Sequence, residues 1–566
     1  MYGLPTTTIA KTELTSNSAS VTLNIDTSAL SFSGGTNSTP RHLIIRINAR
    51  HNSTNDDVLL RFNGDTGNNY NWGSIEGTGT TEAYNASSST YDQSSMKLCE
   101  IDDASNQFNV GEWLVPDAFS TRGHSTVIGV GGVDNTYGVH VTGGRWANTA
   151  ALTSVTFMAS GGTGFAADSY FELAVVDESY SVYQGINTGA GSFDDTTVAT
   201  AGGTNDTGDL VIIGSLKHTA ATVEELSVAL NGDNTESNYW RQRLNGHQAE
   251  IAAYANAVDL MGHTAGGDGN HAEAFYGFAA IIPQYSYTTT NGDRQVLGIA
   301  GGHSSDNSAG DGNASQIALT SLRWNNTAAV DQVTVSGRNS ANFVADSMLS
   351  IYEVPKGLIT RWVVTGDTGS ISFDVGDDYD HLELTGYIRT DGGSASDDLI
   401  VSLTPHGGSS DTTNGNYSTQ ELEGVGSTDT ASASTSDRAV ATVSGSPSGG
   451  DTNLFSAFSM FIPNYRLTDR HKASLSFSGR GDSSASGSYV RSNRWANTAE
   501  IHSIVLTPSG GSNFKAGTIV ELRGVNATVV PPTSDVKKLN SITQASVKKI
   551  NGIAAGSIKK LNTVEF

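Results

Sequence analysis

Three copies of one pattern follow each other along the chain, and this repetition constrains the fold more than any other feature. The hexapeptide Arg-Trp-Ala-Asn-Thr-Ala begins at Arg145, recurs with one substitution at Arg323, and recurs unchanged at Arg494, at spacings of 178 and 171 residues. Four more markers keep their order around it: an acidic pair (Asp56-Asp57, Glu224-Glu225, Asp397-Asp398), an Asn-Tyr pair (ending at Tyr70, Tyr239, Tyr417), an apolar-Pro step (ending at Pro116, Pro283, Pro463) and a Phe-x-Ala turn (starting at Phe165, Phe343, Phe514). These markers predict three homologous domains, over residues 1–178, 179–355 and 356–526.

The local pattern within each repeat is that of β-strands. Residues 20–25, 370–375 and 381–384 alternate between polar and apolar side chains, which places one face of a strand on a core and the other in water. Segments rich in Gly, Ser, Asn and Asp lie between such stretches and suit turns. The sequence therefore predicts an all-β fold of three tandem antiparallel β-sandwich or jelly-roll domains, with about eight strands in each.

The middle repeat departs from the other two in two places. Residues 250–258 are rich in alanine, which favours a short helix. The step from the proline marker to the tryptophan is 41 residues in this repeat, against 30 and 32 in the others. We expect the additional residues to form a longer loop around residues 306–313.

The repeated tryptophans Trp146, Trp324 and Trp495 allow two interpretations. We expect them to pack between two sheets, because truncating a buried Trp to Ala costs about 3–5 kcal/mol and every repeat would need one. The alternative is a glycan-stacking role, which requires exposed indole rings.

Candidate ligand and catalytic groups are few. The acidic pairs have carboxylates of the kind that bind Ca²⁺, but they lack EF-hand spacing, so we expect solvated strand ends. His263, Asp268, His271 and Glu273 form a loose cluster with metal-binding chemistry, but it has no counterpart in the other repeats. No nucleophile elbow or phosphate-binding loop is evident. We therefore predict no catalytic residues, no metal site and no cofactor.

Charge and composition exclude several classes of protein. The net charge of −25 disfavours nucleic acid as a partner. No apolar run approaches the 18 residues of a membrane span. The single cysteine, Cys99, excludes an intrachain disulfide framework. No signal peptide is visible at the start of the chain.

Residues 527–566 form a tail of different composition. An 11-residue unit occurs three times, with apolar residues at its first, fourth and seventh positions and a lysine pair between the first two. The period matches a right-handed supercoil, whereas Asn551-Gly552 and the β-branched residues favour short strands with turns. The segment carries six lysines against two acidic residues. We predict an anchoring or oligomerisation role that involves Lys537, Lys538, Lys548, Lys549, Lys559 and Lys560.

The combination of tandem β domains rich in Gly, Ser, Thr and Asn with this tail resembles tailed-phage structural proteins. The unit Ile-Lys-Lys-Leu-Asn, at Ile558–Asn562, is similar to the "IKKINGV"-type repeats at the ends of virion proteins. The resemblance is strong in the repeat motif of the tail. In the body it is limited to the composition and the tandem β domains. It implies a virion component and carries over no catalytic or ligand residues.

We therefore expect a non-enzymatic virion protein, exposed on the particle as a head decoration protein, head fibre or tail fibre. Three domains in series would give reach, and the tail or the N-terminal segment would anchor the chain. The expected partners are other virion proteins and further copies of the chain, as a trimer by analogy with phage fibres. One alternative is a carbohydrate-binding adhesin that recognises a host surface glycan. Another is a polysaccharide-degrading enzyme, which needs two suitably spaced carboxylates.

Overall fold

The computed structural model describes most of the body of the chain and part of the tail. It covers residues 3–527, apart from 27–39, 54–55, 87–92, 133–137, 162–163, 190, 192, 198–207, 220–223, 248–249, 257–259, 265–272, 288–291, 304–314, 339–341, 355–358, 377, 447–452 and 482–485. Beyond residue 527 it describes only six two-residue strands. The prediction of an all-β fold is confirmed.

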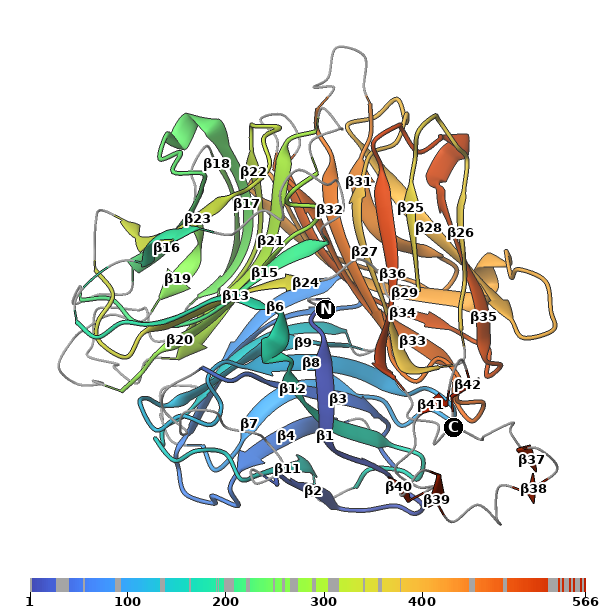
Figure 1. The fold of residues 1–566 in the computed structure, drawn as a ribbon, viewed down its shortest axis with the longest axis horizontal. Coiled ribbons are helices and arrows are strands. Elements are labelled where there is room, and N and C mark those ends of the chain that lie inside the picture. The colour runs from blue at the N-terminus through green and yellow to red at the C-terminus, as the bar shows by residue number, and fades with distance from the viewer. Residues whose placement is uncertain are drawn as a thin grey trace.

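Each third of the chain forms a sandwich of one eight-stranded and one four-stranded antiparallel sheet (Figure 1). In the first repeat the large sheet has the order β1-β12-β3-β8-β9-β10-β5-β6 and the small sheet β2-β11-β4-β7, and both orders recur in the other two repeats. Each repeat thus has twelve strands where about eight were expected.

The strands of the first repeat are β1 Thr6–Glu13, β2 Ser20–Asn24, β3 Leu43–Ala49, β4 Asp56–Phe62, β5 Tyr70–Thr78, β6 Thr81–Ala86, β7 Met96–Ile101, β8 Asn109–Val115, β9 Ser125–Gly132, β10 Val139–Trp146, β11 Ser154–Ala159 and β12 Tyr170–Val176. Those of the second are β13 Ser181–Ile186, β14 Phe193–Thr197, β15 Asp209–Leu216, β16 Glu224–Leu230, β17 Tyr239–His247, β18 Glu250–Asn256, β19 Leu260–Thr264, β20 Tyr276–Ile282, β21 Arg294–His303, β22 Ser315–Trp324, β23 Gln332–Gly337 and β24 Met348–Val354. Those of the third are β25 Thr360–Val363, β26 Ile371–Asp374, β27 Tyr379–Ile388, β28 Ser396–Pro405, β29 Tyr417–Val425, β30 Thr428–Ser434, β31 Ala439–Ser444, β32 Ser456–Ile462, β33 Lys472–Arg480, β34 Gly487–Trp495, β35 Ile501–Pro508 and β36 Ile519–Ala527.

In the part of the chain that the structure describes, helical structure is limited to single 3-10 turns. The described ones are η1 Glu178–Tyr180, η2 Glu236–Asn238, η4 Asn414–Asn416 and η5 Ser509–Gly511. The helix predicted over residues 250–258 is wrong, because this segment contains strand β18, which pairs with β17 over its whole length. Among the described residues, no helix is both long and apolar enough to cross a membrane. The predicted longer loop over residues 306–313 lies outside the described residues.

The two kinds of sheet differ in how they are buried. Most strands of the small sheets alternate as expected, and β26 has the pattern buried, exposed, buried, exposed. The edge strands β7 and β31 are instead buried almost throughout. The central strands of the large sheets are buried on both faces, as β10 is throughout. The edge strands β1, β13 and β25 are partly exposed. The expectation that residues 381–384 have one face in water is therefore wrong: His381 is 0% exposed and Glu383 is 3% exposed. Their polar side chains face a neighbouring repeat instead.

The three large sheets face one another around a common centre (Figure 1). A continuous hydrophobic cluster draws equivalent residues from all three repeats, such as Ile75, Leu244 and Leu422. Each repeat also has its own core between its large and small sheets. The repeats therefore form one compact body with pseudo-threefold symmetry, and the expected extension of three domains in series is not what the structure has. The start of the described chain also contributes to the shared core, in which Leu4 is buried.

Glycines let the three axial hairpins (β5–β6, β17–β18 and β29–β30) approach one another closely. A Cβ atom placed on Gly246 would lie 2.5 Å from Cδ2 of Tyr84 and 2.7 Å from Cγ1 of Ile75 in the first repeat. The equivalent Gly424 faces Leu244 and Ala253 of the second repeat, at 3.3 and 3.4 Å. Each hairpin thus packs its glycine against the apolar side chains of another repeat.

Replacing Gly246 tests this packing. We expect Gly246→Val to lower the free energy of unfolding by about 1–3 kcal/mol, because overpacking forces neighbouring side chains out of their preferred positions. Gly415, whose Cβ would meet nothing within 4 Å, gives a control with the same substitution. Chemical denaturation of both variants is the measurement, and equal losses would contradict close packing at the axis.

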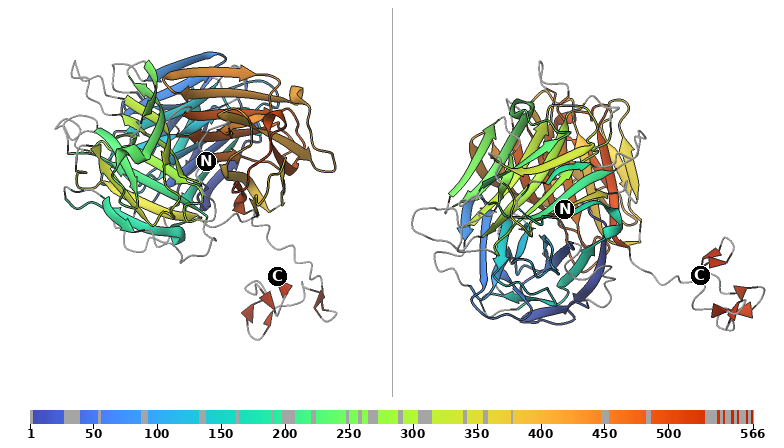
Figure 2. Two further views of the ribbon diagram at one scale, coloured as in Figure 1. Left: turned by 90° about the horizontal axis from the view of Figure 1, so that it is seen from above. Right: turned by 60° about the vertical axis from the view of Figure 1, so that its left-hand side comes forward.

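The tail contains three small hairpins of identical register. Lys538 pairs with Thr543, Lys549 with Ala554 and Lys560 with Glu565. Short strands therefore occur where the sequence allowed either a supercoil or strands. Figure 2 shows the hairpins to one side of the body in both views. Lys537, Lys548 and Lys559 lie outside the described residues, and the side chains of Lys538, Lys549 and Lys560 are not described.

Candidate functional site

The repeated tryptophan is the centre of a hydrogen-bonded clasp in each repeat. In the third repeat, Nε1 of Trp495 donates to Oδ2 of Asp411 (2.9 Å), and Nδ2 of Asn416 donates to the same oxygen (2.8 Å). The hydroxyl of Tyr417 donates to the backbone carbonyl of Asp411 (3.0 Å) and accepts from the backbone N–H of Leu403 (3.0 Å). The equivalent indoles, Trp146 and Trp324, donate to Asp65 (2.8 Å) and Asp233 (2.9 Å).

This clasp accounts for two of the five sequence markers. The Asn-Tyr pair and the tryptophan both hold the loop that contains the aspartate. All three indoles are 1% exposed, so a sugar ring cannot stack on Trp146, Trp324 or Trp495 unless the sandwich opens. Their burial is what the packing interpretation requires.

Replacing Trp495 separates packing from hydrogen bonding. We expect Trp495→Ala to lower the free energy of unfolding by about 3–5 kcal/mol. Trp495→Phe retains most of the buried ring and loses the bond to Asp411, so we expect a smaller loss, near 1–3 kcal/mol. Chemical denaturation measures both values. A negligible loss in Trp495→Ala would show that the indole is not a packing residue.

The aspartate of the clasp is held in its charged form. Partial burial opposes ionisation of Asp411, but hydrogen bonds from Trp495, Thr413 and Asn416 outweigh it and hold its pKa below the usual value. A carboxylate with a lowered pKa stabilises the fold fully above its usual pKa and loses that contribution as the pH falls through the folded pKa.

We therefore expect Asp411→Asn to cost about 1 kcal/mol at neutral pH, since charge-assisted hydrogen bonds exceed neutral ones by roughly that amount. The difference between variant and wild type should shrink below pH 4. Thermal melts from pH 2 to 7 would measure it, and a difference that stays constant with pH would contradict a charged clasp.

The acidic pairs lie where cations from other strands reach them. Nζ of Lys97 lies 3.0 Å from Asp57, and Nη1 of Arg243 lies 3.0 Å from Glu225. In the third repeat, Nη2 of Arg491 lies 3.3 Å from Asp398. One member of each pair is thus paired with a cation from within the protein, and these contacts give no reason to place calcium there. The side chain of Asp398 is still 46% exposed, as a solvated strand end would be.

The loose histidine cluster of the second repeat is only partly described. Asp268 and His271 lie outside the described residues, as does the side chain of His263. Glu273 is described and lies at the boundary with the first repeat, where its Oε2 is 3.2 Å from Nε2 of His124.

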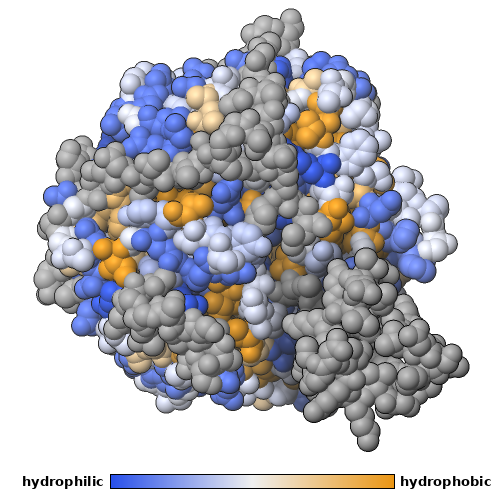
Figure 3. All heavy atoms as spheres, in the orientation of Figure 1, coloured by the Kyte–Doolittle hydropathy of each residue, from blue (hydrophilic) through white to orange (hydrophobic). Residues whose placement is uncertain are grey.

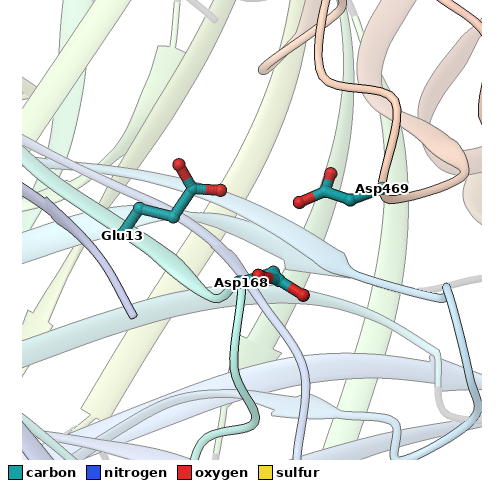
Figure 4. Close-up of side chains that lie close together, drawn as sticks. All are labelled: Glu13, Asp168 and Asp469. Carbon is teal, nitrogen blue, oxygen red and sulfur yellow. The ribbon is translucent and has the colours of Figure 1, made fainter. Parts of the chain in front are cut away.

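One other carboxylate group brings together two repeats. Within the described part of the chain, Glu13, Asp168 and Asp469 are the acidic or metal-ligating side chains close enough to share an ion, with oxygens within 4.8 Å of one another (Figure 4). Two of the three already have a cationic partner, because Arg470 contacts both Glu13 (2.6 Å) and Asp469 (2.7 Å). The cluster is therefore an ionic contact between the first and third repeats.

Three equivalent backbone hydrogen bonds join the repeats in a closed ring. The residue immediately before β9, β21 or β33 donates its N–H to the segment before β20, β32 or β8 of the next repeat. The three bonds are His124 to Glu273 (2.8 Å), Asp293 to Asn453 (2.9 Å) and His471 to Asn106 (2.9 Å). The third bond returns from the last repeat to the first, so three head-to-tail interfaces close within one chain.

A buried polar layer lies at the same boundaries. The residue after each repeated proline has positive φ (Asp117, Gln284, Asn464). Its N–H donates to a side chain at or near the start of the neighbouring strand: His42 (3.2 Å), Asp209 (3.0 Å) and His381 (3.1 Å).

Each of these three acceptors also contacts another repeat. His42 packs edge-on against Tyr352, Asp209 accepts from Nη1 of Arg523 (2.9 Å), and Nε2 of His381 lies 2.8 Å from Oε2 of Glu172. Nδ1 of His381 accepts a hydrogen bond, so its Nε2 carries the proton and donates to Glu172. Burial lowers the pKa of His42 to about 3. The polar layer therefore links the turn after each proline to the next boundary.

Sequence reasoning missed these boundaries, although one signal was present. Phe108, Phe275 and Phe455 each lie eight residues before a repeated proline, and they meet Arg470, Gly123 and Gly292 of the preceding repeat in the ring. The constant spacing identifies a repeated residue. It does not reveal that the partner belongs to another repeat.

Neither a family model nor a curated protein sequence matches the chain. Among solved structures, the LG1-3 region of the laminin alpha2 chain aligns with 91% of this chain and 97% of its own, at 9% identity and a TM-score of 0.13. Domains LG4-5 of the mouse laminin alpha1 chain align with 61% of this chain and 92% of their own, at 9% identity and a TM-score of 0.13. Similarities of this size carry no argument about function.

Proposed function

We propose that this protein is a non-enzymatic structural component of a tailed-phage virion, exposed on the particle as a decoration or fibre protein. The observation that carries the proposal is the division of the chain into two parts. The body is a closed ring in which the described repeated markers pack, cap turns or pair charges. The tail is a separate run of three like hairpins with the opposite charge.

The body supplies a rigid frame. The three large sheets already cover one another within one chain. Association between copies of the chain, which the sequence predicts, would therefore use other surfaces. Figure 3 shows hydrophobic residues scattered in small groups among hydrophilic ones on the visible face. Trp362, at 43%, is the exposed large hydrophobic residue of the described chain. We therefore assign attachment, to further copies or to other virion proteins, to the tail.

The tail has the chemistry for such attachment. Its six lysines against two acidic residues give it a net charge of +4, while the rest of the chain carries −29. Complementary charge steers association and fixes its orientation. The adhesin alternative lacks its expected platform, because the three repeated indoles are buried.

The mass of the protein in solution tests the role of the tail. We expect the full chain to form oligomers, or to bind purified particles, and a chain that ends at Val530 to stay monomeric and unbound. Replacing the six tail lysines with glutamine should reproduce the truncation, and replacing them with arginine should not. Light scattering and co-sedimentation are the measurements. Identical behaviour of all four proteins would remove the tail from the proposal.

Antibody labelling tests whether the protein is located on the virion. A gold-labelled antibody raised against the body should decorate particles purified from the source of this sequence. If the antibody finds the protein only in the infected or producing cells and never on particles, the virion assignment fails.

A further inference from the structure

One of the three boundaries in the ring has no direct covalent support. The first and second repeats follow each other along the chain, as do the second and third, so each of these pairs is held at high effective concentration. The third and first repeats are separated by the whole middle repeat. The ring stays closed only if the contacts at this boundary are favourable by themselves.

The residue two places before β9, β21 and β33 differs in kind at this boundary. It is Gly123 in the first repeat, Gly292 in the second and Arg470 in the third. A Cβ atom on Gly123 would lie 2.6 Å from the ring of Phe275, and one on Gly292 would lie 2.7 Å from the ring of Phe455 and collide with the hydroxyl of Tyr387. Two boundaries therefore accept only glycine here.

The third boundary accepts a full arginine side chain. Arg470 is 1% exposed, and its guanidinium carbon lies 4.5 Å from the centre of the Phe108 ring. Its Nη1 donates to Oδ1 of Asn48 (3.0 Å), and its Nη2 donates to Oε1 of Glu13 (2.6 Å). Asp469 fixes the guanidinium from the other side through Nε (2.7 Å) and Nη2 (2.9 Å).

We propose that Glu13, Asn48 and Phe108 of the first repeat form a docking surface specific for the Arg470 turn of the third repeat, and that this contact closes the ring. A planar guanidinium that stacks on a ring and forms directed hydrogen bonds is a frequent hot spot of protein interfaces. Its occupant is the third repeat of the same chain.

The surface also determines which repeat can occupy it. The first and second repeats have glycine where the third has Arg470, so neither can fill the surface or pair with Glu13. In the third repeat, Tyr387 takes the place of Asn48 in the strand register. An arginine facing that tyrosine would have no room, which disfavours closure of the third repeat on another copy of itself. The order of the repeats is thus encoded at one position.

Cleaving the folded full chain tests the proposal. A protease site placed within residues 355–358, between β24 and β25, allows the third repeat to be separated from the first two after folding. We expect the wild-type fragments to stay associated on size-exclusion chromatography. Arg470→Gly should raise their dissociation constant at least about 30-fold, as the loss of a hot-spot side chain does.

Arg466→Gly is the matched control. This arginine lies in the same turn, is about 38% exposed and pairs with Glu500 of its own repeat, so we expect a change of no more than about twofold. If Arg466→Gly and Arg470→Gly weaken association equally, the docking surface is not specific for Arg470 and the proposal fails.

A second pair of variants protects the test against misfolding of Arg470→Gly. The side chain of Glu13 is 41% exposed, so Glu13→Gln should leave the first repeat folded, as circular dichroism would verify. Combined with Arg470→Lys, which retains charge and loses the planar fork, Glu13→Gln should have less effect than it has alone. Strictly additive effects would mean that the two side chains do not act as a pair, and would overturn the proposal.

Discussion

The rest of this structure depends on one constraint: the central strands of each eight-stranded sheet are buried on both faces, so both faces must be covered. The small sheet covers one face, and the other two large sheets cover the second. Because each large sheet covers part of the other two, three repeats are enough to cover the inner faces of all three large sheets. The glycines on the axial hairpins, such as Gly246, follow from this closure, since three hairpins must meet where little space remains. The polar layer around His42, Asp209 and His381 follows as well, because strand ends buried between repeats still need hydrogen-bond partners.

Much of the structure of a single repeat could be predicted from the sequence. Little of the packing of the repeats against one another could be predicted. Alternation and repeated markers predicted the all-β fold and the threefold repetition of one sandwich, and the burial of Trp495 agrees with the packing interpretation, because these features depend on neighbours within one sandwich. His381 and Glu383 alternate with leucines just as solvent-facing residues do, since alternation distinguishes two faces and does not identify what covers the second. The alanines of β18 were predicted as helix for a related reason. Small residues are needed there because Ala253 packs against Gly424 of the third repeat.

The candidate site shows the same limit. Glu13, Asp168 and Asp469 are each more than 150 residues apart along the chain and share no sequence motif, so only the fold brings their carboxylates together. Arg470 lies within an otherwise ordinary turn. Its significance becomes visible only by comparing it with Gly123 and Gly292 at the equivalent places of the other repeats. Differences among aligned repeats, rather than identities, therefore mark the contacts that make each boundary specific.

Ring closure has a consequence for how such a gene can change. Linear repeat proteins gain or lose units readily, because each unit contacts only its neighbours and the ends need nothing but a cap. Here the last repeat must meet the first, and the rotation between adjacent repeats closes after three. Deletion of one repeat would leave the inner sheet faces of the other two without part of their cover, and loss of the third repeat would remove the Arg470 turn that meets Phe108. We expect relatives to vary freely in their outer loops and to keep the number of repeats fixed at three.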